Sequence, residues 1–368
     1  MIEFLPAGLY FPAHLTISIC LTLLYFAQLS KPRLYGYEQK RQYGIMLIYA
    51  ILFIVVVGLR PISGHYFGDT VNYARLYESM KGLPLGSIME EGEWIFNGFM
   101  WYAAQHIPVQ YFFLIIEILY VVPLIIACKK LVPNNPNVML LFGMTAFSFF
   151  TYGTNGIRNG MACSLIILAL AFMKDKTWKS KCMAILLAYI AFGCHKSTAL
   201  PILCMVVCLF FKNTKYAIYF WLFSIFVSLV AGNSVESFFT SLGFDDRMSE
   251  YSSANIDASL FSSTGFRWDF LLYSFMPILL GWYIVVKRRV KNNLYSYLLN
   301  SYIFCNAFWV MMIRASYSNR FAYLSWFIYP IVLAYPLLKF PVFKQKNNQK
   351  VAWILLAHTM FTLLLSLK

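Results

Sequence analysis

The sequence predicts an all-α, polytopic integral membrane protein with about twelve transmembrane helices (about 10–12). Of its 368 residues, 60% are hydrophobic and only 12% are charged, whereas a soluble domain carries about 25% charged residues. The mean hydropathy is +0.63. The apolar residues form blocks of roughly 15–20, the length of helix that crosses about 30 Å of hydrocarbon. These observations exclude a soluble globular domain.

Twelve apolar segments are the expected membrane spans. They lie approximately at 8–27, 44–59, 109–127, 138–152, 157–173, 183–194, 197–211, 216–232, 268–286, 294–313, 319–338 and 351–366. The segments at 183–194, 197–211 and 351–366 are short for a membrane crossing, which leaves about ten crossings as an alternative. We expect residues 1–368 to form a single membrane domain, with outer loops at about 60–93 and 233–267.

Two further helices are expected between the second and third spans. Asp69 stands where an N-cap would start a helix over about 70–81. Residues 90–106 contain an apolar run that is too short to cross a membrane and that begins after Glu93. This run is typical of a helix that lies in the outer membrane interface. Its residues expected against lipid are Trp94, Phe99 and Trp101.

The distribution of Lys and Arg predicts the orientation in the membrane. One set of loops, which includes KPRLYGYEQKR, KDKTWKSK, KNTK and KRRVK, carries 20 of the 30 basic residues and only two acids, Glu38 and Asp175. The opposite side carries 10 basic residues and 12 acids. Because cytoplasmic loops are enriched in Lys and Arg, the basic set should be cytoplasmic, with both termini outside. The net charge of +15 is therefore explained by topology, and no nucleic-acid partner is predicted.

The outer side is unusual in its type of base. It holds 7 Arg and 3 Lys, whereas the cytoplasmic side holds 4 Arg and 16 Lys. Outer arginines oppose the orientation rule, so each needs another explanation. Arginine presents a planar fork that can bind two phosphate oxygens at once. The simpler alternative is that each side chain extends from a helix end to the headgroup layer.

Polar residues gather at five places on this outer side. These are the end of span 44–59 with the following loop, which holds Arg60 and Asp69; the start of 90–106, with Glu93; the opening of 157–173, with Arg158; the turn between 183–194 and 197–211, with His195; and the turn between Arg314 and Arg320. Interrupted or short helices at membrane depth are tolerated where they line a cavity, and polar residues there indicate function. An extracytoplasmic site is predicted. Two simpler roles stay open: Asp69 as a helix cap and His195 as an ordinary turn residue.

No cofactor or metal site is predicted. The eight cysteines lie in or beside the apolar blocks without a CxxC pair, which favours packing roles over a disulfide framework or a zinc site. No acidic constellation suited to a metal stands out either.

A series of short motifs resembles the EpsG family of polysaccharide polymerases, which is related to the Wzy-type polymerases of bacteria. The resemblance covers roughly residues 44–338. Its motifs are Arg60 followed by Gly68, Asp69 and Tyr73; Glu93 with Phe96; Ile157, Arg158 and Asn159; Phe192, His195 and Ser197; and Asn319, Arg320 and Tyr323. Asn159 stands where the family usually has glutamine. A looser match, with Arg247 and Tyr251, falls in the loop 233–267.

The resemblance implies the substrate and the chemistry. The expected reaction is glycosyl transfer, in which oligosaccharide repeat units on undecaprenyl diphosphate are joined into capsule, O-antigen or exopolysaccharide. It implies a multi-pass protein of the bacterial cytoplasmic membrane with its site facing outside, and a flippase and a chain-length regulator as partners. The departing lipid diphosphate gains negative charge, and fixed cations stabilise such charge. The outer arginines are expected to do this in place of Mg²⁺.

The resemblance also gives the site residues their expected roles. Arg158 stands on a helix N-terminus, which already favours anions, and is the main diphosphate ligand. Asp69 is the preferred base for the acceptor hydroxyl, and His195 is the second candidate. The other residues expected to bind substrate are Arg60, Tyr73, Glu93, Asn159, Arg247, Arg314 and Arg320.

Two other classes of protein would share these features. A flippase or transporter of lipid-linked sugars would have the same basic cavity, although the sequence shows no convincing internal repeat of the kind that such proteins contain. A membrane acyltransferase or ligase acting on glycans would also place polar groups at outer helix ends.

Overall fold

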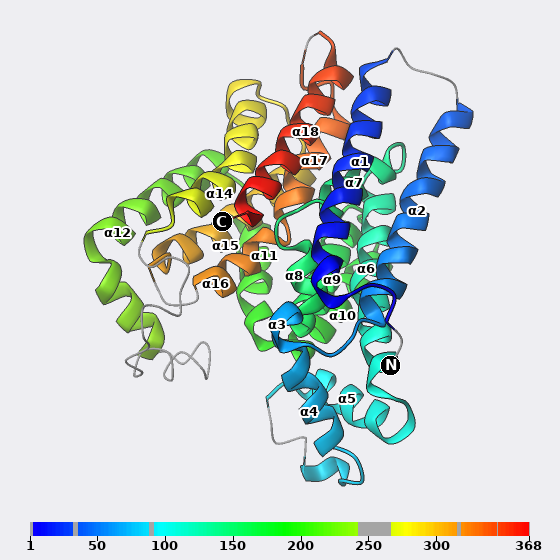
Figure 1. Cartoon of the computed structure of the whole chain (residues 1–368). Helices are drawn as coiled ribbons and strands as arrows, with labels where there is room; N and C mark the ends of the chain where they lie inside the picture. Colours follow the sequence, from blue (N-terminus) through cyan, green and yellow to red (C-terminus); the bar gives the residue numbers. More distant parts are fainter. Residues whose placement is uncertain are drawn as a thin grey trace. The chain divides into compact units, whose positions relative to one another are not determined.

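The computed structural model describes residues 3–31, 36–87, 92–241, 266–314, 318–343 and 345–367 (Figure 1). Every regular element within these ranges is a helix, which confirms the all-α prediction. The chain divides into two compact units: Met1–Thr198 with Ala334–Lys368 (unit 1), and Ala199–Leu333 (unit 2). The single-domain assignment stays a prediction.

Unit 1 contains most of the N-terminal half and the end of the chain. Its helices are η1 Ala7–Leu9, α1 Tyr10–Ser30, α2 Gly36–Gly58, α3 Gly64–Phe67, α4 Thr70–Ser79, η2 Leu85–Ser87, α5 Trp94–His106, α6 Val109–Leu131, α7 Pro136–Met144, α8 Phe149–Thr154, α9 Ile157–Phe172, α10 Trp178–Cys194, η3 Lys196–Thr198 and α18 Asn347–Ser366. Unit 2 contains α11 Ala199–Phe210, α12 Thr214–Ser241, α14 Trp268–Gly281, the π-helical η5 Trp282–Lys287, α15 Asn293–Met311 and α16 Ser318–Trp326. Helix α17 Tyr329–Lys339 begins in unit 2 and ends in unit 1.

Within the described residues, six helical segments are long and apolar enough to cross a membrane. They are Ala7–Ser30, Val109–Leu131, Thr214–Gly232, Trp268–Lys287, Phe321–Lys339 and Asn347–Ser366. Three shorter apolar helices, Gly44–Gly58, Ile157–Phe172 and Lys196–Phe210, fall below that length. The predicted membrane class is therefore supported. The predicted number of crossings stays a prediction, as does the orientation.

Two of the expected spans are interrupted. The segment 138–152 forms α7 and α8, separated by Thr145–Ser148, and the segment 319–338 forms α16 and α17, separated at Phe327 and Ile328. The Thr145 hydroxyl donates to the Leu141 carbonyl at 2.8 Å, which satisfies one of the backbone acceptors at the end of α7. Non-helical backbone of this kind is tolerated in membrane proteins where protein covers it, and Thr145 is buried.

The centre of unit 1 is α6, which packs against α2, α7 and α9. Gly58 permits the close approach of α2, because a Cβ at that position would lie 2.8 Å from the Leu114 Cα. Helices α1 and α18 pack together and share a hydrogen bond between the Thr22 and Thr359 hydroxyls at 2.9 Å. Small residues and interhelical hydroxyl bonds are the usual means of joining helices in lipid, where the hydrophobic effect between helices is absent.

The core of unit 2 is α15, which packs against α11, α12, α14 and α16. Its Asn306 amide ties two neighbours together. The Asn306 Oδ1 accepts from the Trp221 indole at 2.7 Å, and its Nδ2 donates to the Ser325 hydroxyl at 3.0 Å. The stacked rings of Tyr273 and Tyr329, with centroids 4.2 Å apart, fill the space beside α14. Buried polar groups satisfied in this way fix which helix faces meet.

The two helices expected before the third span are present. Helix α4 runs over Thr70–Ser79 where 70–81 was predicted, and α5 runs over Trp94–His106. Trp94 is exposed, as expected of a lipid-facing residue. Phe99 packs on Phe112 of α6, with ring centroids 5.6 Å apart, and the Trp101 indole donates to the Leu83 carbonyl at 2.7 Å. Both side chains are half-buried, so their contact with lipid stays a prediction.

Candidate functional site

Glu93 is the central residue of a charged cluster at one end of unit 1, where α4 and α5 lie (Figure 1). Its Oε2 pairs with the Arg158 guanidinium of α9, and its Oε1 lies 2.5 Å from the Nδ1 of His195, which follows α10. The backbone N–H of Lys196 also donates to this carboxylate. The structure thus brings together three positions that are distant in the sequence, and each had been expected at the site.

The sequence around Gly193 explains why His195 reaches Glu93. Helix α10 packs against α5, and a Cβ at Gly193 would lie only 2.6 Å from the Ile95 Cδ1. Glycine is therefore required for the two helices to approach so closely. His195 then leaves the helix in an extended conformation, and its carbonyl accepts from the Thr198 hydroxyl at 2.7 Å. This turn directs the imidazole toward the start of α5.

Arg158 is held between the charged cluster and two aromatic rings. Its Nε donates to the Tyr73 hydroxyl at 3.1 Å, and its guanidinium carbon lies 5.4 Å from the centre of the Tyr73 ring and 5.8 Å from that of Phe96. The arginine side chain is 20% exposed. Burial raises the pKa of the Tyr73 hydroxyl against the opposing effect of the Arg158 charge, so the hydroxyl stays protonated.

Burial alone would raise the pKa of the Glu93 carboxyl. The hydrogen bond from His195, the charges of His195 and Arg158, and the bond from the Lys196 N–H outweigh this effect. The pKa of Glu93 therefore lies below its ordinary value, and the carboxylate is ionised at neutral pH. An ionised carboxylate beside Nδ1 favours the imidazole tautomer with the proton on Nδ1, so that Nε2 is the basic nitrogen.

Asp69 occupies the N-cap position of α4, but its side chain makes no capping hydrogen bond. Its Oδ1 instead accepts from the Asn72 amide at 3.2 Å. The Asp69 N–H donates to the Asn155 Oδ1 at 2.8 Å, in the break between α8 and α9. Gly68, with φ of +53°, lies directly against Asn155, which leaves no room for a side chain. The capping alternative for Asp69 is thus not the arrangement in the structure, and its carboxylate acts on Arg158 and Tyr73 through its charge.

Arg60 was expected to contact substrate, but the structure places it inside the protein. Its side chain is fully buried, with Nη1 3.7 Å from the Glu117 Oε1. The guanidinium donates to the carbonyls of Val57 at 2.8 Å and Thr154 at 3.0 Å, and to the Thr70 hydroxyl at 3.2 Å. Arg60 therefore has no surface from which to touch a ligand. It joins the end of α2 to the start of α4 and the end of α8, which support Asp69 and Asn155.

The remaining predicted residues are placed less directly. Asn159 accepts from the Cys163 thiol on its own helix at 2.9 Å. Arg314 is exposed in unit 2, where its aliphatic stem lies beside Gly232 and its guanidinium faces the Phe266 ring at 5.9 Å. Arg320 lies in α16, but its side chain is outside the described part, and Arg247 lies outside the described residues altogether. Arg247, Arg314 and Arg320 all belong to unit 2, so their roles at the site stay predictions.

Sequence reasoning missed two residues that contact predicted site residues in the structure. Asn155, in the TNG sequence before Ile157, accepts the Asp69 N–H. Glu117, a single acid within the apolar segment Val109–Leu131, pairs with Arg60. The second could have been found from sequence, because an ionisable residue within a membrane-length segment indicates a functional or paired group. In the part of the chain that the structure describes, no three His, Cys, Asp or Glu side chains are grouped to hold a metal ion.

The fold and this cluster define a polytopic helical membrane protein with a charged site at the ends of its helices. The comparison with protein families matches the model of the EpsG family over residues 42–368. The chain therefore belongs to the EpsG family, as its motifs predicted. The comparisons with curated proteins and with solved structures gave no match.

Proposed function

We propose that this protein polymerises undecaprenyl-diphosphate-linked oligosaccharides on the outer side of the membrane by glycosyl transfer. The observation that carries the proposal is the bridge of Glu93 to both Arg158 and His195. It joins a guanidinium at the start of α9 and an imidazole at the end of α10 to one carboxylate at the start of α5. Membership of the EpsG family supports a role in polysaccharide biosynthesis. The substrate is the one that the family resemblance implies, and the chemistry of the site is compatible with glycosyl transfer from it.

In the proposed reaction, an acceptor sugar hydroxyl attacks the anomeric carbon of the donor chain. The bond from that carbon to the diphosphate oxygen breaks, and the lipid diphosphate leaves with the bonding electron pair. The acceptor proton passes to the Nε2 of His195, because Nδ1 is hydrogen-bonded to Glu93. The geometry thereby favours His195 over Asp69 as the base. Asp69 would instead contribute its negative charge beside Arg158 and the turn that it forms with Asn155.

Arg158 is proposed to bind the departing diphosphate. A guanidinium has five N–H donors, and in this structure one donates to Tyr73 and one to Glu93, which leaves three for a ligand. Arg158 also stands on the first turn of α9, a helix of 16 residues whose N-terminus attracts anions. Glu93 holds the guanidinium in position, and the diphosphate replaces solvent at its remaining face.

Deletion of the gene tests the proposed function. Sizing of the lipid-linked glycans should show accumulation of single repeat units and loss of longer chains. Purified protein in liposomes with lipid-linked repeat units should then lengthen the glycan. Transfer of the glycan to a different acceptor would show a ligase, and movement across the bilayer without lengthening would show a flippase. Either result would overturn the proposal.

A matched pair of variants links the activity to the site. Glu93→Gln removes the negative charge at the centre of the cluster. Glu78→Gln makes the same change on the neighbouring helix α4, where Glu78 is 54% exposed and pairs with Lys81. We expect Glu93→Gln to abolish chain lengthening and Glu78→Gln to leave it unchanged. Equal activity of the two variants would show that the charged cluster is not the site.

A further inference from the structure

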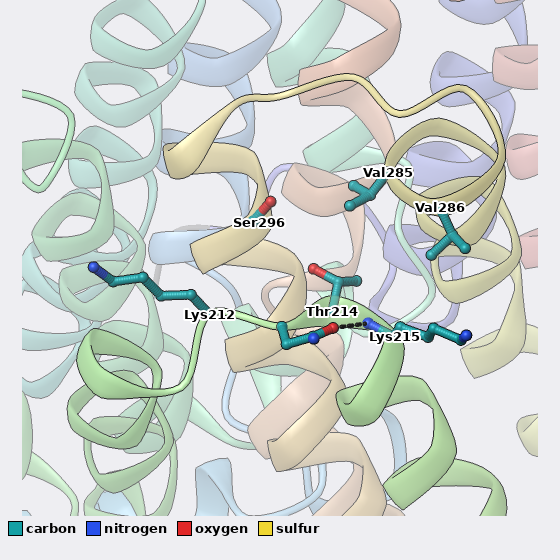
Figure 2. Close-up of a pocket in the computed structure, with 7 residues that line it drawn as sticks. Lys212, Thr214, Lys215, Val285, Val286 and Ser296 are labelled. Carbon is teal, nitrogen blue, oxygen red and sulfur yellow. Dashed lines mark hydrogen bonds between the residues drawn. The ribbon is translucent and has the colours of Figure 1, made fainter.

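Unit 2 contains a pocket of about 450 Å³ at the end of its helices opposite Arg267 and Asp269. Its walls come from three elements (Figure 2): the turn between α11 and α12, the π-helical η5, and the first turns of α15. The lining residues are Lys212, Asn213, Thr214, Lys215, Val285, Val286 and Ser296. These elements belong to the loops predicted to be cytoplasmic, so the pocket is separate from the proposed polymerisation site.

Thr214 gives the pocket an unmet hydrogen-bonding group. It is only 3% exposed, and its hydroxyl oxygen is buried without a hydrogen-bond partner. A buried hydroxyl without a hydrogen bond lowers the stability of the folded state. Asn300, one helical turn beyond Ser296 on α15, donates to the Phe211 carbonyl at 3.4 Å and fixes the position of the turn that carries Thr214. A ligand that hydrogen-bonds to Thr214 would remove the cost of leaving its hydroxyl unpaired.

Two lysines flank Thr214 in the sequence and line the same pocket. Figure 2 shows the side chains of Lys212 and Lys215 extending to opposite sides of Thr214. Both lysines are exposed, and their flexible chains allow the amino groups to turn toward a bound anion. Four more cations follow Val286 in the sequence: Lys287 at the end of η5, and Arg288, Arg289 and Lys291 after it. The sequence has no acid from Ala199 to Ser234 or from Phe270 to Leu333, so none of this charge is neutralised locally by those segments.

The backbone also contributes positive charge at the pocket. Helix α12 begins at Thr214 and runs for 28 residues, so its N-terminal partial positive charge lies at the pocket. The Asn213 Oδ1 accepts from the Lys215 N–H at 3.1 Å and so orders this first turn. A buried hydroxyl donor, a helix N-terminus and flanking amino groups together match the oxygens of a phosphate group.

We propose that this pocket binds a phosphate-bearing anion. Two sources share the required chemistry, the headgroup of an anionic phospholipid and soluble phosphate. Basic pockets between helices on the cytoplasmic side of membrane proteins bind such headgroups. Val285 and Val286 supply an apolar wall beside the polar one, which suits a ligand with a phosphate at one end and an apolar part at the other.

The test uses purified full-length protein with two probes. Phosphatidylglycerol binding is counted by native mass spectrometry, with phosphatidylcholine as the comparison whose phosphate is balanced by its own quaternary ammonium, so that its net charge is zero. Inorganic phosphate binding is measured as the shift in unfolding temperature, against potassium chloride at equal ionic strength. The variants are Thr214→Val, which removes only the hydroxyl, and Lys212→Gln with Lys215→Gln. The control is Lys179→Gln with Lys181→Gln, two exposed lysines on a loop also predicted to be cytoplasmic.

Saturable binding of phosphatidylglycerol would identify a lipid headgroup, and saturable binding of inorganic phosphate alone would identify a soluble anion. In either case, apparent affinity should fall roughly 25-fold in the double lysine variant, at about fivefold per lysine. It should also fall in Thr214→Val, while the ligand-free unfolding temperature of that variant stays equal or rises, because an unpaired hydroxyl is removed. Binding of neither probe, or equal loss in the control, would overturn the proposal.

Discussion

The carboxylate of Glu93 and the imidazole of His195 are hydrogen-bonded across 102 residues of sequence, with Oε1 2.5 Å from Nδ1. The same carboxylate pairs with Arg158 through its other oxygen. One acidic residue therefore sets both the tautomer of the histidine and the position of the arginine.

The choice of base can be tested by comparing two variants. If His195 takes the acceptor proton, His195→Gln keeps a hydrogen-bonding side chain but loses the base, and polymer formation should fall about 10²–10⁴-fold. Polymer formation should fall less in Asp69→Asn, because the Asp69 side chain makes no capping hydrogen bond and the backbone N–H of this residue still donates to Asn155. The rate of chain lengthening in liposomes is the measurement. If Asp69→Asn lost all chain lengthening while His195→Gln kept a near-normal rate, Asp69 would be the base.

Substitution of Arg158 by lysine tests whether this residue acts through its positive charge alone or also through the planar shape of its guanidinium. Arg158→Lys keeps a positive charge but cannot donate to both Tyr73 and Glu93 while also binding a ligand in a planar fork. We expect normal expression and a loss of about 10²–10³ in rate, comparable to removal of one fixed donor in other enzymes. Wild-type polymer lengths from Arg158→Lys would show that the residue needs only its charge.

The buried pair of Arg60 and Glu117 should matter mainly for stability. Glu117→Gln removes the carboxyl group whose Oε1 lies 3.7 Å from the Nη1 of the fully buried Arg60, and loss of one partner from a buried pair is destabilising. The unfolding temperature should fall clearly. The double variant Arg60→Met with Glu117→Leu should lose less stability than the sum of the two single variants, because no unpaired charge stays buried. An unfolding temperature unchanged in Glu117→Gln would contradict this role.

The lowered pKa of Glu93 predicts a pH dependence of stability. A group whose pKa is lowered by folding contributes stability that is complete above its ordinary value, 4.5, and that disappears as the pH falls through the lowered value. The difference in unfolding temperature between wild type and Glu93→Gln should therefore be constant from neutral pH to about pH 5 and shrink in more acid solution. Glu78→Gln changes an exposed ion pair, so its unfolding temperature should differ little from that of the wild type at any pH. A difference that grows on acidification would refute the assignment.

The orientation can be tested by labelling single cysteines in intact cells. On a background without the eight native cysteines, a membrane-impermeant thiol reagent should modify Ser79→Cys in the outer loop but not Trp178→Cys in the cytoplasmic one. Both positions are exposed, with Trp178 at 75%, so burial does not confuse the result. After membrane permeabilisation both should react. Labelling of position 178 in intact cells would reverse the orientation and place the charged cluster in the cytoplasm.

The sequence by itself determined where the helices lie and which of them are apolar. Each expected span coincides with one helix or with an interrupted pair, and α4 begins directly after Asp69. Runs of apolar residues, glycine breaks and capping positions act over a few residues, so they can be read without knowledge of the fold. The motif residues around Arg158, Glu93 and His195 were likewise recognisable as site candidates.

Only the tertiary structure decided which of these residues meet. Glu93 pairs with Arg158 and His195 because Gly193 lets α10 approach α5, and the interhelical distance at that glycine has no local signature. The same applies to Arg60, which lies inside the protein because Val57, Thr70 and Thr154 accept its hydrogen bonds beside Glu117 of α6. Helix formation depends on neighbours along the chain, whereas side-chain pairing across helices depends on how their faces pack, and one sequence without its fold does not specify that packing.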